Sequence, residues 1–262
     1  MTRAQPRTNF HSSALLRCLT DLAVVPAAEP ETAFAEKLGL WIHFTDAIKL
    51  SAIHGEGAIG VAASKGTGQP GAGRKEDARG ALGLAFDRVE AALTESIVKS
   101  CSINPGRAHI TLPRPVFTLP LDLAVAYEPY RRFYDAHQHD MTLNVQPLRV
   151  NVREALAKAS PALRKLADLD AALETILRER ERKLLAKVPV LLKTRFSQLY
   201  QAHQQDLVTT GQSDNPFAWM QPDAWLARFC KDLQMLLLAE FELRLQPALG
   251  LIEAFDHNIQ HD

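Results

Sequence analysis

The stretch that decides the fold lies between two copies of one pattern, Tyr134-Asp-Ala-His137-Gln-His-Asp140 and Tyr200-Gln-Ala-His203-Gln-Gln-Asp206. Both copies read Tyr-x-Ala-His-Gln-x-Asp, and an Arg-Phe pair stands shortly before each of them. The residues between them contain almost no glycine and are dense in Leu, Ala, Glu, Lys and Arg, which favour helix. The stretch from residue 127 to residue 206 is therefore predicted to form long helices.

Prolines divide this stretch. One helix is predicted from residue 127 to residue 160, with a bend at Pro147. Ser160 followed by Pro161 is typical of an N-cap and a first helical residue, so a second helix begins there. Pro189 is predicted to bend or break that helix, which then continues to Asp206. The second helix carries an apolar stripe at helical spacing: Leu163, Leu166, Leu169, Leu173, Ile176 and Leu177.

Helical spacing recurs on both sides of this stretch. Helices are predicted over residues 9–22, 31–54 and 76–100, and a last long helix begins at Pro222. That last helix is apolar on several sides, which predicts a position at the centre of the core. Pro247 is predicted to kink it. The fold class is therefore all-α, a bundle of about five or six long, proline-kinked helices.

Two segments interrupt the helices. Residues 55–75 are predicted to be a flexible Gly-rich linker, because seven of the thirteen glycines lie at residues 55–73. Gly55-Glu-Gly57-Ala-Ile-Gly60 matches G-x-G-x-x-G, but no helix is expected to open from it, as a dinucleotide site requires. Residues 101–122 form a Pro-rich loop. The predicted division is an N-terminal helical segment at 1–54, the linker at 55–75 and the main bundle at 76–262.

Composition and charge argue against several classes of function. Thirty Lys and Arg balance thirty Asp and Glu, and a protein that binds the phosphate backbone generally has a basic excess or face. No apolar run approaches the roughly 18 residues of a membrane span, and we expect no secretory signal at the N-terminus. Three widely separated cysteines, Cys18, Cys101 and Cys230, predict free thiols. We therefore expect a soluble, cytoplasmic protein without a cofactor.

The duplicated pattern supplies the densest set of metal-ligand residue types. His137 and Asp140 are three residues apart and share one helix face, as do His203 and Asp206. If the chain folds back near Ser160, the two histidines are roughly 30 Å out of register, so the two copies are not expected to form one site.

Three interpretations of the pattern stay open: a packing seam in which each histidine donates to a carboxylate one turn on, a metal or catalytic site using His137 and His203, and a surface for a protein partner or for self-association. The residues of that surface are Tyr134, His137, Asp140, Tyr200, His203 and Asp206.

A run of basic residues, Arg178-Glu-Arg-Glu-Arg-Lys183, offers a nucleic-acid site as another alternative. The interleaved acids argue against it, because Glu174 with Arg178 and Glu179 with Lys183 form i,i+4 pairs in the favourable order. A solvated, salt-bridged helix face is the simpler interpretation, and we expect no nucleic-acid partner.

Several longer segments resemble a proteobacterial family of unknown function, domain of unknown function 3348. The resemblance rests on Pro129-Tyr-Arg-Arg-Phe-Tyr-Asp-Ala-His-Gln138, Ser160-Pro-Ala-Leu-Arg-Lys-Leu-Ala167 and Arg180-Glu-Arg-Lys-Leu-Leu-Ala186, among others. It implies no catalytic residue. It implies an accessory role beside a cell-envelope system, with peripheral association at the membrane.

The sequence as a whole favours a non-enzymatic helical interaction or assembly protein. We expect it to have a protein partner or to form a homo-oligomer, with the Leu-rich helices as the contact between its chains. A metal-dependent helical enzyme using His137 and His203 is the first alternative. Nucleic-acid binding through Arg178–Lys183 is the second.

Overall fold

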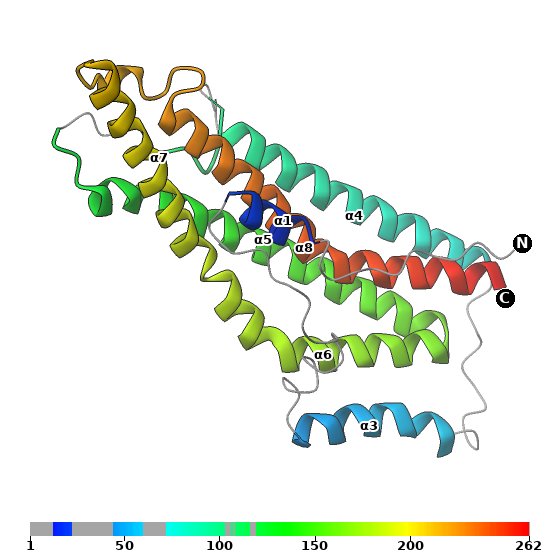
Figure 1. Cartoon of the computed structure of the whole chain (residues 1–262). Helices are drawn as coiled ribbons and strands as arrows, with labels where there is room; N and C mark the ends of the chain where they lie inside the picture. The colour runs from blue at the N-terminus through cyan, green and yellow to red at the C-terminus, as the bar shows by residue number, and fades with distance from the viewer. Residues whose placement is uncertain are drawn as a thin grey trace, which may run out of the picture. The chain divides into compact units, whose positions relative to one another are not determined.

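The computed structural model describes residues 13–22, 44–59, 72–102, 106, 108–115 and 119–261 (Figure 1). Within these ranges the backbone forms helices and loops and no strand, so the all-α prediction is confirmed. The helices are α1 (Ala14–Asp21), α3 (Phe44–Ile59), α4 (Ala72–Ser100), α5 (Leu123–Ala159), α6 (Pro161–Leu185), α7 (Val188–Thr210) and α8 (Trp225–His261), with a one-turn 3-10 helix, η2 (Pro216–Ala218).

The predicted helix limits in the central stretch agree closely with the structure. The hydroxyl of Ser160 accepts a hydrogen bond from the backbone N–H of Leu163 at 3.2 Å, which is the N-cap geometry expected of Ser-Pro. Helix α6 ends at Leu185, and Pro189 lies in the first turn of α7, so a break occurs where it was predicted. Gly211 ends α7 with a φ of 65°, a conformation that glycine adopts without strain.

The Gly-rich segment differs from the prediction at both ends. Helix α3 runs on through Gly55 and Gly57 to Ile59, and α4 begins at Ala72, whereas residues 55–75 were predicted to be linker. Residues 60–71 lie outside the described residues. The bends at Pro147 and Pro247 stay predictions, since both prolines lie within continuous helices, α5 and α8.

The chain divides into two units by its contacts. Unit 1 consists of residues 1–30, 93–141 and 186–243, and unit 2 consists of residues 31–92, 142–185 and 244–262. Three of the five limits between these units fall inside helices, in α4, α5 and α8. The predicted division at residues 1–54, 55–75 and 76–262 stays a prediction. Each unit is described by itself below.

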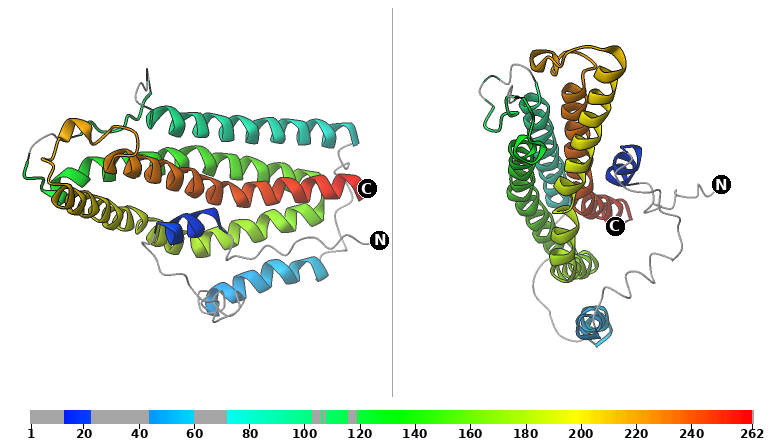
Figure 2. Two further views of the ribbon diagram at one scale, coloured as in Figure 1. Left: turned by 45° about the horizontal axis from the view of Figure 1, so that its top comes forward. Right: turned by 60° about the vertical axis from the view of Figure 1, so that its left-hand side comes forward.

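Aromatic rings form the centre of unit 1, where α7 lies beside the first half of α8 (Figure 2). Phe196 of α7 is 1% exposed, and its ring centroid lies 4.9 Å from that of Phe229 and 5.2 Å from that of Trp225. Tyr127 and Tyr130 of α5 lie against the same ring, at 5.7 and 5.8 Å. The aromatic residues near the start of α8 are thus buried at the centre of a core, as its sequence predicts.

In unit 2, a cluster of charged side chains joins α5 to α6. The carboxylate of Asp170 accepts hydrogen bonds from the guanidinium groups of Arg149 and Arg153, and Arg153 also donates to Glu174. These side chains are only 13–15% exposed, so they are shielded from solvent. Helix α3 packs on α6 in the same unit (Figure 1). On this helix Thr45 and Ile48 are exposed, while Leu50 is half-buried.

Candidate functional site

The first copy of the duplicated pattern lies in α5 and points into unit 1. The side chain of His137 is 1% exposed and its Nε2 lies 2.9 Å from the hydroxyl of Ser100, the last residue of α4. That hydroxyl donates its one hydrogen to the carbonyl oxygen of Ile97 at 2.8 Å. Nε2 of His137 therefore carries a hydrogen and donates it to Ser100.

The other polar residues of this copy hold a buried carboxylate. Glu240 of α8 is fully buried, and its Oε2 accepts a hydrogen bond from the hydroxyl of Tyr134 at 2.9 Å. The amide of Gln138 donates to both carboxylate oxygens, at 2.9 and 3.0 Å. A buried charge is costly unless donors replace its water, and these two side chains do so. The first copy thus ties α5 to α4 and to α8.

The second copy lies in α7 and organises the loop that follows it. Nε2 of His203 lies 2.9 Å from Oδ1 of Asp214, and the amide of Gln204 donates to Oδ2 at the same distance. The indole N–H of Trp219 donates to Oδ1 at 2.8 Å. Burial tends to raise the pKa of Asp214, but the hydrogen bonds from these three side chains outweigh it and lower that pKa. Asp214 is therefore an ionised anchor point for the loop.

Aromatic rings close around the second copy. The ring of His203 is stacked near that of Trp225, with centroids 6.2 Å apart. Tyr200 lies against both Trp219 and Trp225, at 6.3 and 5.3 Å. Since Trp219 and Trp225 are 2% and 5% exposed, this cluster is filled core. Trp219 thereby packs the loop onto α7 and α8.

The two copies therefore use the same residues in a related way. In each, the glutamine after the histidine donates to a carboxylate that lies on another segment, Glu240 or Asp214. The two histidines have separate partners, Ser100 and Asp214. Of the final aspartates, Asp140 is half-buried and Asp206 is exposed. The assignment of these residues to a partner surface stays a prediction.

A metal site would need at least three ligand side chains close together. Among the residues that the structure describes, no three His, Cys, Asp or Glu side chains are arranged to hold a metal ion. The three cysteines are free thiols, and burial raises the pKa of Cys101 to about 11 and that of Cys230 to about 12. Both are protonated at neutral pH.

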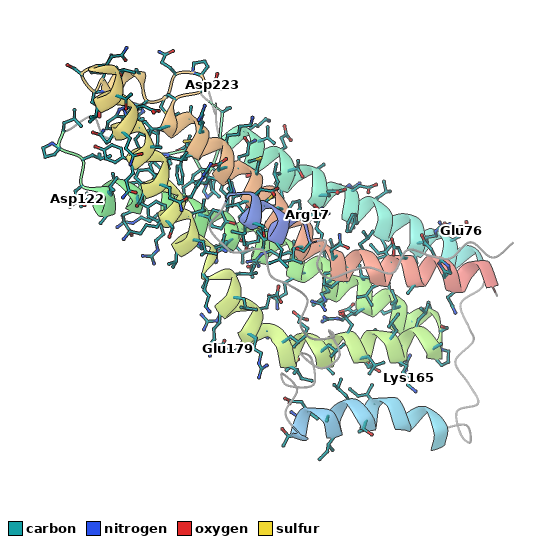
Figure 3. All side chains as sticks on the ribbon, viewed as in Figure 1. Arg17, Glu76, Asp122, Lys165, Glu179 and Asp223 are labelled. Carbon is teal, nitrogen blue, oxygen red and sulfur yellow. The ribbon has the colours of Figure 1, made fainter. Side chains whose placement is uncertain are left out.

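The basic run near the end of α6 forms the ion pairs predicted for it. Arg178 lies 3.5 Å from Glu174, and Lys183 lies 3.5 Å from Glu179. Arg182 adds two hydrogen bonds to Glu179, at 2.9 and 3.0 Å. Figure 3 labels Glu179 near the end of α6 that leads into α7. The salt-bridged face is confirmed, and the nucleic-acid alternative stays a prediction without support from this geometry.

Sequence reasoning missed the partners of both histidines and both glutamines. Ser100 and Glu240 lie 37 and 102 residues from the side chains that they bind, so spacing along one helix cannot reveal them. Glu240 did leave a signal, because it interrupts the apolar face formed by Leu233, Leu236 and Leu237. An acid at such a position indicates a buried carboxylate that must have donors.

The buried histidine predicts a particular pH dependence of stability. Burial lowers the pKa of His137 to about 4, although Asp140 acts in the opposite direction. In the unfolded chain its pKa is about 6.5, so protons bind the unfolded state first. The contribution of neutral His137 to the free energy of unfolding is therefore fully present above pH 6.5. It is lost as the pH falls towards 4, and the loss amounts to about 3 kcal/mol in total.

Urea unfolding of the native sequence and of His137→Gln, between pH 7.5 and 4.5, measures this effect. The native protein should lose more stability than the variant as the pH falls, because only it has this group to protonate. Taking the difference between the two proteins removes the contribution of the carboxylates. Parallel curves for the two proteins would contradict the assignment.

The fold and the two polar clusters define an all-α protein whose duplicated pattern fastens helices and a loop within unit 1. The model of the family described as protein of unknown function DUF3348 matches residues 1–257, so the chain belongs to that family. A comparison with curated proteins found no match, and a comparison with solved structures found none. In the part of the chain that the structure describes, no helix has the length and apolar character to cross a membrane.

Proposed function

We propose that this chain is a non-enzymatic helical interaction or assembly protein. The observation that carries the proposal is the α7–α8 loop, residues 211–224, which presents Phe217 with 76% of its surface exposed. Large aromatic side chains dominate the binding energy of protein interfaces, and an exposed one on an ordered segment supports the proposal of such a surface.

The loop is held in a defined conformation by several independent contacts. Asp214 receives its three side-chain hydrogen bonds from His203, Gln204 and Trp219. The side chain of Asn215 caps η2 by accepting from the backbone N–H of Phe217 at 3.2 Å. A loop fixed in advance loses little conformational entropy on binding, which favours affinity. The second copy of the pattern thereby has a role in presenting Phe217.

The placement of this activity beside a cell-envelope system is part of the proposal. It comes from the family resemblance, which implies an accessory role there. A partner found among envelope proteins would support this part, and a partner of another kind would leave only the interaction itself.

Photo-crosslinking tests the proposal in cells of the source organism. The full chain carries p-benzoylphenylalanine in place of Phe217, and the matched control carries it in place of Val190, which is also exposed on unit 1. We expect a protein adduct of defined mass from position 217 that exceeds any from position 190. Equal or absent adducts at the two positions would contradict the proposal.

A further inference from the structure

Helix α1 in unit 1 is short and has one apolar face. Leu15, Leu19 and Leu22, the residue directly after the helix, are each 5% exposed. They follow one another at i, i+4 and i+7, so they form one stripe along the helix, the leucine stripe. Leu16 lies off this stripe and is 48% exposed. The leucine stripe is therefore the face by which α1 packs onto the rest of unit 1.

Apolar burial alone holds α1 in place. Among the described residues, no hydrogen bond or ion pair joins residues 13–22 to another helix or to a loop, and the hydroxyl of Thr20 bonds within the helix, to the carbonyl oxygen of Leu16. The side chain of Ser13, at the N-cap, makes no capping hydrogen bond. The helix has eight residues, and isolated helices shorter than about 12–15 residues are marginal in water. Helix α1 therefore stays folded only while its leucine stripe is buried.

Helix α1 covers part of one face of α8. Figures 1 and 2 show it beside the middle of α8. Burial raises the pKa of Cys18, and the carboxylate of Glu242 adds to this effect, so these two side chains lie near each other. Met235 and Leu238 precede Glu242 by seven and four residues and share its face of α8. Leu238 is half-buried, whereas Met235 is still 40% exposed. The apolar face of α8 therefore extends beyond α1.

We propose that α1 is a removable cover, and that the face of α8 beneath it binds an amphipathic helix of a partner protein. The partner helix carries apolar side chains at i, i+4 and i+7, because the leucine stripe shows the spacing that this site accepts. A partner helix of three or more turns would also contact Met235, so it would bury more apolar surface than α1 does. The unbranched side chain of methionine adapts to different partners. The site does not include Phe217, so the inference goes beyond the proposed function.

Covering the site makes partner binding a competition. While α1 is docked, a partner helix can bind only the fraction of molecules in which α1 has left α8, and its apparent affinity is reduced by that fraction. A change that weakens the docking of α1 therefore raises the affinity for the partner helix. A purely structural role of α1 predicts no such gain, because loosening the helix would then only destabilise unit 1.

A helical peptide with the sequence of residues 13–22 stands in for the partner helix in the test. It carries Cys18→Ser to prevent oxidation. Arg17→Lys allows a lactam to Asp21 that holds the peptide helical, and both positions are exposed on α1, so the lactam leaves the leucine stripe free. Fluorescence anisotropy measures the binding of this peptide to the purified full chain.

The double variant Leu15→Ala with Leu19→Ala weakens the docking of α1. It is expected to bind the peptide at least about tenfold more tightly than the native chain does. Leu16→Ala is the matched control, since it truncates an exposed leucine of the same helix, and it should bind the peptide like the native chain. Adding Leu238→Ala to the double variant should weaken the peptide at least about tenfold, because Leu238 lies on the covered face of α8.

Several results overturn the proposal. They are equal binding of the peptide by the native chain and the double variant, binding by neither, and binding by the Leu16→Ala chain that matches the double variant. Binding that Leu238→Ala leaves unchanged also overturns it, because the peptide would then occupy another surface.

Hydrogen exchange of the native chain tests the cover without any substitution. The amides of α1 are expected to exchange at least about a hundredfold faster than those at buried positions of α8, because α1 leaves its site without unfolding of unit 1. Circular dichroism shows whether each variant keeps its helices. If the double variant unfolds, hydrogen exchange decides the matter: amides of α1 that exchange as slowly as those of α8 overturn the proposal.

Discussion

Replacement of Asp170 by alanine is expected to lower the free energy of unfolding by about 3 kcal/mol. Asp170 accepts three hydrogen bonds in unit 2: Nε and Nη2 of Arg149 lie 2.9 and 2.6 Å from its oxygens, and Nε of Arg153 lies 2.6 Å away. Its removal leaves two shielded guanidinium groups without their shared counter-charge. The loss exceeds that of a surface ion pair, which is worth about 1 kcal/mol or less.

Guanidinium unfolding followed by circular dichroism measures this loss. The matched control is Asp168→Ala, because Asp168 is an exposed aspartate two residues away on the same helix. Its effect should stay within about 0.5 kcal/mol. Asp170→Ala combined with Arg149→Ala should cost less than the sum of the two single changes, since the partners are removed together. Equal effects of the Asp170 and Asp168 variants would show that the cluster does not join α5 to α6.

Replacement of Glu240 by alanine is expected to have an effect of similar size, about 3 kcal/mol. Glu240 is fully buried in α8, and Tyr134 and Gln138 both donate to it. Truncation leaves a cavity and takes a shared acceptor away from the buried hydroxyl of Tyr134 and the half-buried amide of Gln138. Glu240→Gln keeps the shape and one acceptor oxygen, so it should cost about 1 kcal/mol.

Glu242→Ala provides the control on the same helix, because Glu242 is exposed. It removes the same chemical group without opening a cavity, and its effect should be within about 0.5 kcal/mol. Urea titration of the three variants distinguishes the cases. If Glu240→Ala were as stable as the native protein, the first copy of the pattern would not stabilise unit 1 through this carboxylate.

Local signals in the sequence predicted the helices well because helix limits depend on near neighbours. Ser160 and Pro161 start α6 by capping and by the fixed φ of proline, and both act within one turn. The ion pairs of Glu174 with Arg178 and of Glu179 with Lys183 follow from helical spacing alone.

Contacts between distant segments could not be predicted in this way. His137 and His203 are equivalent in the sequence, yet one meets a serine of α4 and the other an aspartate of the following loop. The concentration of glycines at residues 55–73 led us to place Gly55 and Gly57 in a linker, and each glycine lowers helix propensity by about 1 kcal/mol. Packing of α3 on α6 outweighs that local preference, as tertiary contacts commonly do.

The division of the chain into two units has a consequence for experiments that map the interaction surface. Each unit is assembled from three separate stretches of sequence, and three of the five limits between them fall within α4, α5 and α8. No single cut separates one whole unit from the other. A deletion that extends beyond residue 30 from the start, or that begins before residue 244 at the end, removes parts of both units, so a lost interaction would report unfolding. Partner binding in this protein is therefore best mapped by point substitutions at exposed positions in the intact chain.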